Sequence, residues 1–450
     1  MVIETRPAPM ALAERLLGYA ADEGATQAEV LVSEDESSLT RFANSEIHQN
    51  VAERDSQLSL RLIDGRRIGC AATNRFDDAA LRQLAARAAR IARLQPEQDE
   101  AVELPEPGPI PAVSGGYSSA TAQATPELRA DGALAVIGAA DATDMLAYGS
   151  FTTRTEHLGV ANSKGVRAYE ERTWAQLLTV SMGPDGEAGY AETAAVDVTT
   201  IDAAAVGREA ADKARRSRGP VALAPGEYPV VLEEYAVGDI LELLGYLGFS
   251  AQAVQEGRSF HEPGRVVGSP LVTILDDAHD PAGMPVAFDY EGVAKQRVVL
   301  IEDGVCREVV YDARTAQRAG VRSTGHGLPA PNTLGPVPLN MFMSAGDTAR
   351  EDLVRGLDRG LLVSRFHYTN PVHPKLAIIT GMTRDGLFLV EHGEIVGPVR
   401  NLRFTQSYLG ALAGVQAVST ERRLLRGFLG PMVVPAVRIA AFEFTGATEH

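Results

Sequence analysis

Alternation between apolar and polar residues in the first half of the chain most constrains its fold. Residues 57–63 alternate in this way and lead into Asp64-Gly65, which is typical of a tight turn between antiparallel strands. Leu12, Leu16 and Ala20 instead recur at helical spacing and predict a helix over residues 8–23. The first half is therefore expected to combine an antiparallel sheet with amphipathic helices.

The same patterns extend this expectation over residues 1–219. Strands are predicted over residues 28–33, 38–43, 57–63, 66–73, 146–155, 159–170 and 172–182, and further helices over residues 77–94, 128–143 and 201–216. Residues 96–116 are rich in proline, which interrupts helices and sheet ladders, so this segment is expected to cross the surface. We place the end of an N-terminal α+β domain at residue 219.

The second half, residues 220–450, has a different pattern. One helix is predicted over residues 236–246, and it is followed by short apolar runs at 271–275, 297–301, 376–380 and 386–390, separated by Gly, Pro and Asp. Short strands at such spacing are typical of a barrel or a sandwich. The predicted fold class is α+β, with a mostly β C-terminal domain that is barrel-like or sandwich-like.

Charge and cysteine content exclude several classes of protein. The chain has 42 Lys plus Arg against 59 Asp plus Glu, a net charge of −17, so it lacks the basic surface that binds nucleic acid. Cys70 and Cys306 are isolated, which leaves no disulfide framework and no thiolate zinc cluster. We find no secretory pattern and no run of about 20 apolar residues that would span a membrane. These features predict a cytoplasmic protein without a nucleic-acid or membrane partner.

One segment resembles a known motif. Residues 228–245 place a strand before a helix whose first turn reads Glu234-Tyr-Ala-Val-Gly-Asp239. This segment resembles the TldD/TldE family, also called TldD/PmbA, where catalytic members have His-Glu-x-x-x-His, often as His-Glu-Ala-Val-Gly-His. The Ala-Val-Gly centre is kept. Glu234 stands at the first ligand position, Tyr235 at the position of the catalytic glutamate and Asp239 at the second ligand position.

Two further stretches extend the resemblance over nearly the whole chain. Residues 42–49, followed by the hairpin at Asp64-Gly65, look like the N-terminal sheet of the family. Residues 383–402 are similar to its C-terminal signature, which is the most specific of the three. Catalytic members also use a cysteine near the C-terminus as third zinc ligand, and this chain has no cysteine after Leu425.

The chemistry of these residues can be judged without the family. Zinc hydrolysis needs three protein ligands, an open position for water and a general base. Tyr235 is a poor base at neutral pH because the ordinary pKa of a phenol is about 10. Glu234 and Asp239 lie about 140° apart around an ideal helix, so both can face one ion only if the helix is distorted. We expect a degenerate site with no catalytic residue and no metal ligand. Binding of a hard cation by the two carboxylates remains an alternative.

The resemblance implies a function for a chain without the zinc motif. Such members look like TldE/PmbA, the subunit that pairs with a zinc-bearing TldD subunit in a heterodimeric peptidase that takes unfolded peptides. No cofactor is then expected in this chain, and zinc is expected in the partner. Extended peptides bind along free strand edges, so residues 376–380 and the loop 325–338 are candidates for lining a peptide chamber. The candidate lining residues are His326, Asn332, His367, Thr380, Thr383 and Arg384.

Two other readings remain open from the residues. The chain could be a self-sufficient metal hydrolase, with Asp239, Asp276 and His279 brought together by folding. It could also be a homodimeric peptide-binding protein without activity. Peptide substrate and pathway do not follow from the sequence.

Overall fold

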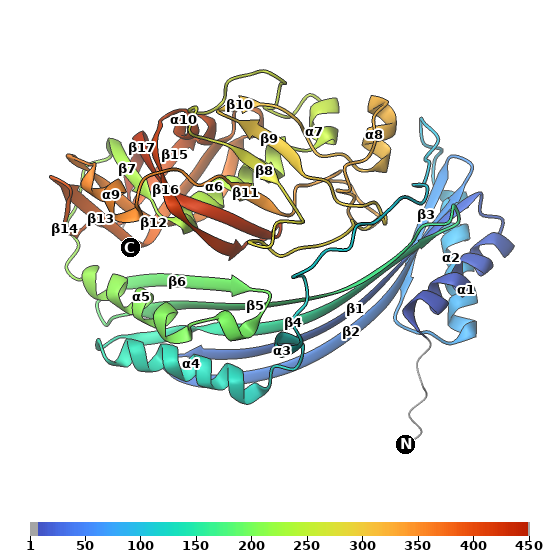
Figure 1. Cartoon of the computed structure of the whole chain (residues 1–450), viewed down its shortest axis with the longest axis horizontal. Coiled ribbons are helices and arrows are strands. Elements are labelled where there is room, and N and C mark those ends of the chain that lie inside the picture. Colours follow the sequence, from blue (N-terminus) through green and yellow to red (C-terminus); the bar gives the residue numbers. More distant parts are fainter. Residues whose placement is uncertain (1–7, 449–450) are drawn as a thin grey trace.

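A computed structural model describes residues 8–448, which form two β-sheets packed against each other (Figure 1). The first sheet has six antiparallel strands in the order β3-β2-β1-β4-β5-β6. Its strands are β1 (Gln27–Ala43), β2 (Glu46–Asp64), β3 (Arg67–Thr73), β4 (Leu146–Asn162), β5 (Arg167–Met182) and β6 (Ala188–Ala195). The predicted hairpin at Asp64-Gly65 joins β2 to β3, and the antiparallel sheet is confirmed.

Helices cover one face of this sheet in two groups. They are α1 (Pro9–Asp22), α2 (Asp78–Leu94), α3 (Ser119–Ala122), α4 (Pro126–Asp141), the 3₁₀ turn η1 (Val198–Thr200) and α5 (Ala203–Arg216). Buried side chains of α1 and α2 pack on β1–β3, and those of α4 and α5 pack on β4–β6. Asp77 and Asp202 begin their helices by accepting a backbone N–H three residues later. Figure 1 shows α4 on the side that points away from the second half of the chain, whereas α5, which packs beside β6, also contacts β13 of the second half.

The second half is mostly β, as predicted. Its strands are β7 (Gly226–Leu232), β8 (Ile274–Asp276), β9 (Val298–Glu302), β10 (Val305–Cys306), β11 (Met341–Met343), β12 (Arg359–His373), β13 (Ile378–Glu391), β14 (Glu394–Pro398), β15 (Leu402–Ser407), β16 (Val415–Arg426) and β17 (Pro431–Ala447). Between them lie α6 (Glu234–Gly248), α7 (Ala251–Gln255), α8 (Ala313–Ala319), α9 (Arg350–Arg355), η2 (Pro374–Leu376) and α10 (Tyr408–Ala413). Pairings β17–β15, β15–β13, β13–β12, β12–β7 and β7–β17 close a ring, so this sheet contains a barrel.

Helix α6 packs against this ring and brings the motif segment to the junction of the two halves. Its buried apolar residues, including Val237, Ile240 and Leu244, belong to the largest hydrophobic core of the chain. Strand β7 lies between β12 and β17 and ends at Leu232, so the first turn of α6 is held at a fixed point. The helix begins two residues before the predicted start.

The expectation of a free strand edge at residues 376–380 is wrong. Within β13, Ile378, Ile379 and Thr380 pair with β12 on one side and with β15 on the other. Their backbone groups are therefore used within the sheet and offer no template for a peptide. Helices that combine the length and the apolar character needed to cross a membrane do not occur in residues 8–448.

Candidate functional site

The first turn of α6 presents three polar side chains where the two halves of the chain meet. Glu233 precedes the helix, Glu234 is its first residue and Tyr235 follows. Glu233 and Glu234 are 5% and 2% exposed, so their charges require partners. Acidic residues at this end of a helix are also stabilised by the partial positive charge of its N-terminus.

Both glutamates have cationic partners from distant elements. Arg350, the first residue of α9, donates from Nε and Nη2 to the two carboxylate oxygens of Glu234, at 2.8 and 3.0 Å. Its Nη2 also lies 3.0 Å from Oε1 of Glu233, whose Oε2 is 2.7 Å from Nζ of Lys213 on α5. Burial alone would raise the pKa of Glu233, but Lys213 and Arg350 hold it at about 2. Glu233 is therefore ionised, and this ion-pair network joins the two halves.

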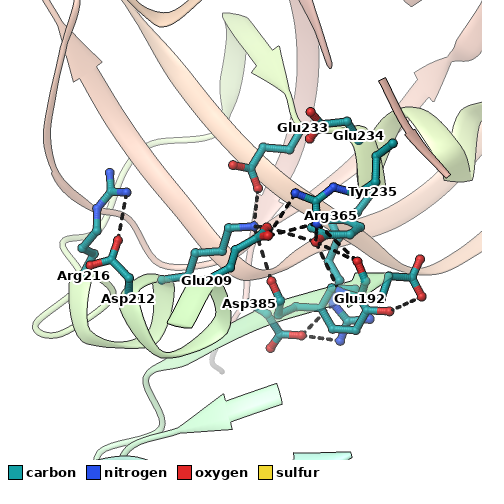
Figure 2. A network of polar contacts seen from close by, with 12 residues as sticks. Glu192, Glu209, Asp212, Arg216, Glu233, Glu234, Tyr235, Arg365 and Asp385 are labelled. Carbon is teal, nitrogen blue, oxygen red and sulfur yellow. Dashed lines mark hydrogen bonds and ion pairs between the residues drawn. The ribbon is translucent and has the colours of Figure 1, made fainter. Parts of the chain in front are cut away.

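Tyr235 belongs to the same network (Figure 2). Its hydroxyl donates to Oε1 of Glu209 on α5 at 3.0 Å, accepts the backbone N–H of Glu192 at 3.2 Å and contacts Arg423. Arg423 also donates to Oε2 of Glu209 at 2.9 and 3.0 Å. Burial, and then the charge of Glu209, raises the pKa of Tyr235 well above its ordinary value. The phenol thus stays protonated and cannot accept a proton from water.

Asp239 lies one turn further along α6, at a small cavity. Its carboxylate accepts hydrogen bonds from the hydroxyls of Tyr408, at 2.6 Å, and Thr369, at 2.7 Å. Burial raises the pKa of Asp239 to about 6, and the two hydroxyl donors limit this rise. The carboxyl group of Asp239 is thus a weaker acid than an ordinary aspartic acid side chain.

The cavity beside Asp239 has a volume of about 150 Å³. Tyr190, Glu192, Tyr235, Glu242, Arg365 and Met432 contribute to its walls. One side is closed by Leu425 at the end of β16 and by Gly427 in the turn that follows. A Cβ atom on Gly238 would lie 3.0 Å from Cδ1 of Leu425, so β16 approaches the helix closely and favours glycine there.

The residues around α6 do not fit a zinc ion. Both oxygens of Glu234 accept hydrogen bonds from a guanidinium, and both oxygens of Asp239 accept them from hydroxyls. Lys213, Arg350 and Arg423 pair with Glu209, Glu233 and Glu234, so these carboxylates are already engaged by cations of the chain. In the part of the chain that the structure describes, no three His, Cys, Asp or Glu side chains form a group that could hold a metal ion.

The alternative metal site is not assembled. Asp276 is fully buried, and its oxygens accept from Nε2 of His326 at 2.9 Å and from the backbone N–H of Asn340 at 2.8 Å. Asp239 and His279 do not join it in a metal-holding group within residues 8–448. A hydrolase built on Asp239, Asp276 and His279 therefore lacks its site.

The six candidate lining residues are scattered. His326 is buried and lines a second cavity between the two halves of the chain. Asn332 stabilises its own turn by accepting the backbone N–H of Leu334. Thr383 is buried against Asn401, whereas Arg384 is exposed beside Asp385. His367 and Thr380 lie on β12 and β13, and neither lines the cavity beside Asp239.

Sequence reasoning missed the cations that occupy this site. Lys213, Arg350 and Arg423 reach α6 from α5, α9 and β16, which are far apart in the sequence. No local motif marks them, since each is an ordinary basic residue until folding brings it to α6. Only Tyr235, a phenol at the position of the catalytic glutamate, indicated that the surroundings of the motif differ from those in catalytic members of the family.

Comparisons with known proteins agree with this fold. Models of the three domains of PmbA/TldA metallopeptidases match the chain: domain 1 over residues 28–92, the central domain over residues 120–218 and the C-terminal domain over residues 225–446. The crystal structure of TldE from Thermococcus kodakarensis superposes with a TM-score of 0.89 at 20% identity, covering 97% of this chain and 100% of that one.

Named relatives match over shorter stretches. A metalloprotease TldD homolog from Buchnera aphidicola is 27% identical over 212 residues, which are 45% of this chain and 42% of the relative. A metalloprotease from Methanothermobacter thermautotrophicus is 26% identical over 232 residues, half of each chain. The chain thus spans about half the length of the curated relatives it matches. Because the three domain models together cover most of its length, the chain belongs to the PmbA/TldA metallopeptidase family, also called TldD/PmbA.

Proposed function

We propose that this chain is the non-catalytic, TldE-like subunit of a heterodimeric zinc peptidase. A TldD-like partner supplies the metal and the general base, and this chain supplies part of the wall of the chamber that receives unfolded peptides. The complex acts in proteolysis or peptide maturation in the cytoplasm. An acidic chain of net charge −17 suits such a role better than nucleic-acid binding.

One observation carries this proposal. The three positions that align with the zinc motif are engaged in other interactions: Glu234 pairs with Arg350, the phenol of Tyr235 is hydrogen-bonded and protonated, and Asp239 accepts two hydroxyls. A water-activating zinc site needs three ligands and a base, and this arrangement offers neither. Catalysis by the family's chemistry therefore requires a second chain.

The test is a peptidase assay of this chain alone, of a His-Glu-x-x-x-His paralogue alone and of their mixture, with zinc analysis of each purified protein. We expect zinc only in the paralogue and hydrolysis of unfolded peptides only in the mixture. Stoichiometric zinc together with hydrolysis by this chain alone would refute the proposal. Stable peptide binding by a homodimer, with no gain on mixing, would favour an inactive peptide-binding protein.

Matched variants sharpen the test. Asp239→Asn in this chain keeps the shape of the side chain, so the mixture should retain its activity within about twofold, since no reacting group is lost. Changing the motif glutamate of the partner to glutamine should abolish hydrolysis. If Asp239→Asn abolished hydrolysis while the two chains still associated, this chain would supply a catalytic residue and the proposal would be wrong.

A further inference from the structure

A second cavity lies between the first sheet and the C-terminal half and has a volume of about 140 Å³. Trp174 of β5 forms part of one wall, and Lys295 and His326 lie on the opposite half of the chain. The turn between β16 and β17 separates it from the cavity beside Asp239, because Arg426 and Gly430 line the second cavity whereas Gly427 lines the first. The proposed function assigns no role to this second cavity.

Lys295 is a buried amine with unused hydrogen-bonding capacity. Burial lowers its pKa, and the nearby charges of Asp276 and Asp289 favour its charged form. The residue is 4% exposed, and Nζ has no hydrogen-bond acceptor among residues 8–448. The nearest ion-pair partner is Oδ1 of Asp276 at 3.5 Å, and this oxygen already accepts from His326. Asp289, also on the cavity wall, directs its carboxylate to the backbone N–H groups of Glu291, Val293 and Gly327. An ammonium group has three hydrogens to donate, so a buried one without acceptors favours an anionic ligand.

A second basic residue, Arg426, lines the same cavity together with Glu156, whose charge acts on it from outside ion-pair distance. The guanidinium of Arg426 lies 3.9 Å from the centre of the Trp174 ring, and it forms no ion pair with a described residue. Trp174 is fixed beneath it by a hydrogen bond from Nε1 to Oε1 of Glu156, at 3.0 Å. Stacking on an aromatic ring orients a guanidinium and leaves its edge free to bind a carboxylate through two parallel hydrogen bonds. The third cation on the wall, Arg172, is already bonded to Glu170.

The rest of the wall is apolar and the space is small. Met284, Phe288, Leu339 and Pro431 contribute side chains. Pockets for drug-sized ligands have roughly 300–1,000 Å³, so about 140 Å³ suits a single residue. We propose that this cavity binds the terminal carboxylate of a peptide whose last residue is apolar, with Lys295 and Arg426 as the groups that hold the carboxylate. The residues of the cavity wall are the reason to expect a carboxylate as ligand. That this carboxylate belongs to a peptide rests on the proposed function.

The test uses the single tryptophan of the chain, Trp174, as a reporter. The full chain, without partner or metal, is titrated with N-acetyl-alanyl-leucine, with the C-terminal amide of that dipeptide and with isovalerate, while tryptophan emission is followed. We expect the free acid to change the emission saturably and the amide to bind at least about tenfold more weakly, because it lacks the charge. Isovalerate should also bind more weakly than the dipeptide, since it lacks the peptide group.

Variants locate the binding to the two cations. Lys295→Met and Arg426→Met should each weaken binding of the free acid by about tenfold, the loss of one charge-assisted contact. Lys375→Met is the matched control, because Lys375 is exposed and does not line the cavity, and this variant should bind as the unchanged chain does. Circular dichroism checks folding, and if Lys295→Met does not fold, Arg426→Met decides.

Three results would overturn this inference: equal binding of acid and amide, unchanged binding in the folded variants, or no binding at all. Isovalerate binding as tightly as the dipeptide would overturn the peptide end and leave a site for small carboxylates. These results are independent of the proposed function, which is judged by hydrolysis in the mixture. Binding without hydrolysis would refute only the proposed function, and hydrolysis without binding would refute only this site.

Discussion

Replacement of Asp239 by asparagine should change how stability depends on pH. Burial raises the pKa of this carboxyl from 3.8 to about 6, so its ionisation costs about 3 kcal/mol more in the folded than in the unfolded chain, at about 1.36 kcal/mol per pKa unit. Because the folded pKa is the higher one, the contribution of Asp239 to stability is complete below 3.8 and is lost as the pH rises through about 6. Between about pH 5 and about pH 8, the expected loss is about 1.4 kcal/mol.

Asparagine does not titrate, so Asp239→Asn should gain about 1.4 kcal/mol relative to the unchanged chain over that interval. Its amide can satisfy Tyr408 and Thr369 only if one hydroxyl turns, but that cost is the same at both pH values. Urea unfolding followed by circular dichroism at the two pH values measures the difference. Asp347→Asn is the control and should follow the unchanged chain, because this exposed carboxylate is hydrated in both states. A difference between Asp239→Asn and the unchanged chain that does not vary with pH would refute the reasoning.

Three further predictions concern charge and metal. Lys213→Met should lower the free energy of unfolding by about 3 kcal/mol, because it leaves the carboxylate of Glu233 buried with one partner fewer. Arg355→Met, which breaks an exposed ion pair, should lower it by less than about 1 kcal/mol. Urea unfolding of the two variants measures the difference. Arg61→Met should cost about 3 kcal/mol or more in the same assay, because it removes the cation that lies 2.8 Å from the buried carboxylate of Glu29 and 3.2 Å from Glu291, whose pKa burial raises to about 8. An effect below about 1 kcal/mol would contradict the role of this cluster. Adding zinc or a chelator should leave the melting temperature of the isolated chain unchanged, because a ligand raises the melting temperature only by binding the folded state. A clear rise with zinc would show that the chain has a zinc site and would contradict this prediction.

Local patterns predicted most helices of the first half, because the residues that decide them are close in sequence. The helix expected over residues 77–94 is α2, which begins at Asp78 after its cap. The predicted strands overlap β1–β5 but are divided wrongly, since the strand expected over residues 159–170 crosses the turn between β4 and β5, and residues 46–56 of β2 and the whole of β6 were not predicted. The polar residues between 33 and 38 indicated a break, yet β1 continues through them, because Arg54 of β2 pairs with Glu34 and Glu36, and Arg154 of β4 pairs with Asp35. Such cross-strand ion pairs stabilise a polar stretch within a sheet and leave no signal in one strand.

The candidate site was predictable in position but not in its contacts. The resemblance of residues 234–239 to the family motif located the site at the first turns of α6, and the chemistry of a phenol argued against a base there. The partners of these residues depend on which helices and strands meet at the junction, and nothing in the order of residues reports that Arg350 will reach Glu234. The burial of Lys295 could not be predicted for the same reason, because burial depends on which segments the fold brings together.

The first turn of α6 connects the two halves through charge instead of through metal. Glu233 binds α5 through Lys213, Glu234 binds α9 through Arg350, and Tyr235 meets the backbone of β6 at Glu192. In a structural metal site, binding of the ion supplies the free energy that orders its ligands; here the cationic side chains order these residues, so the junction forms without an ion. Histidines at positions 234 and 239 would still leave Arg350 paired with Glu233, and Lys213 and Arg423 paired with Glu209. The misfit to zinc therefore lies in the ion pairs that engage the acids around α6 as well as in the three residues of the motif.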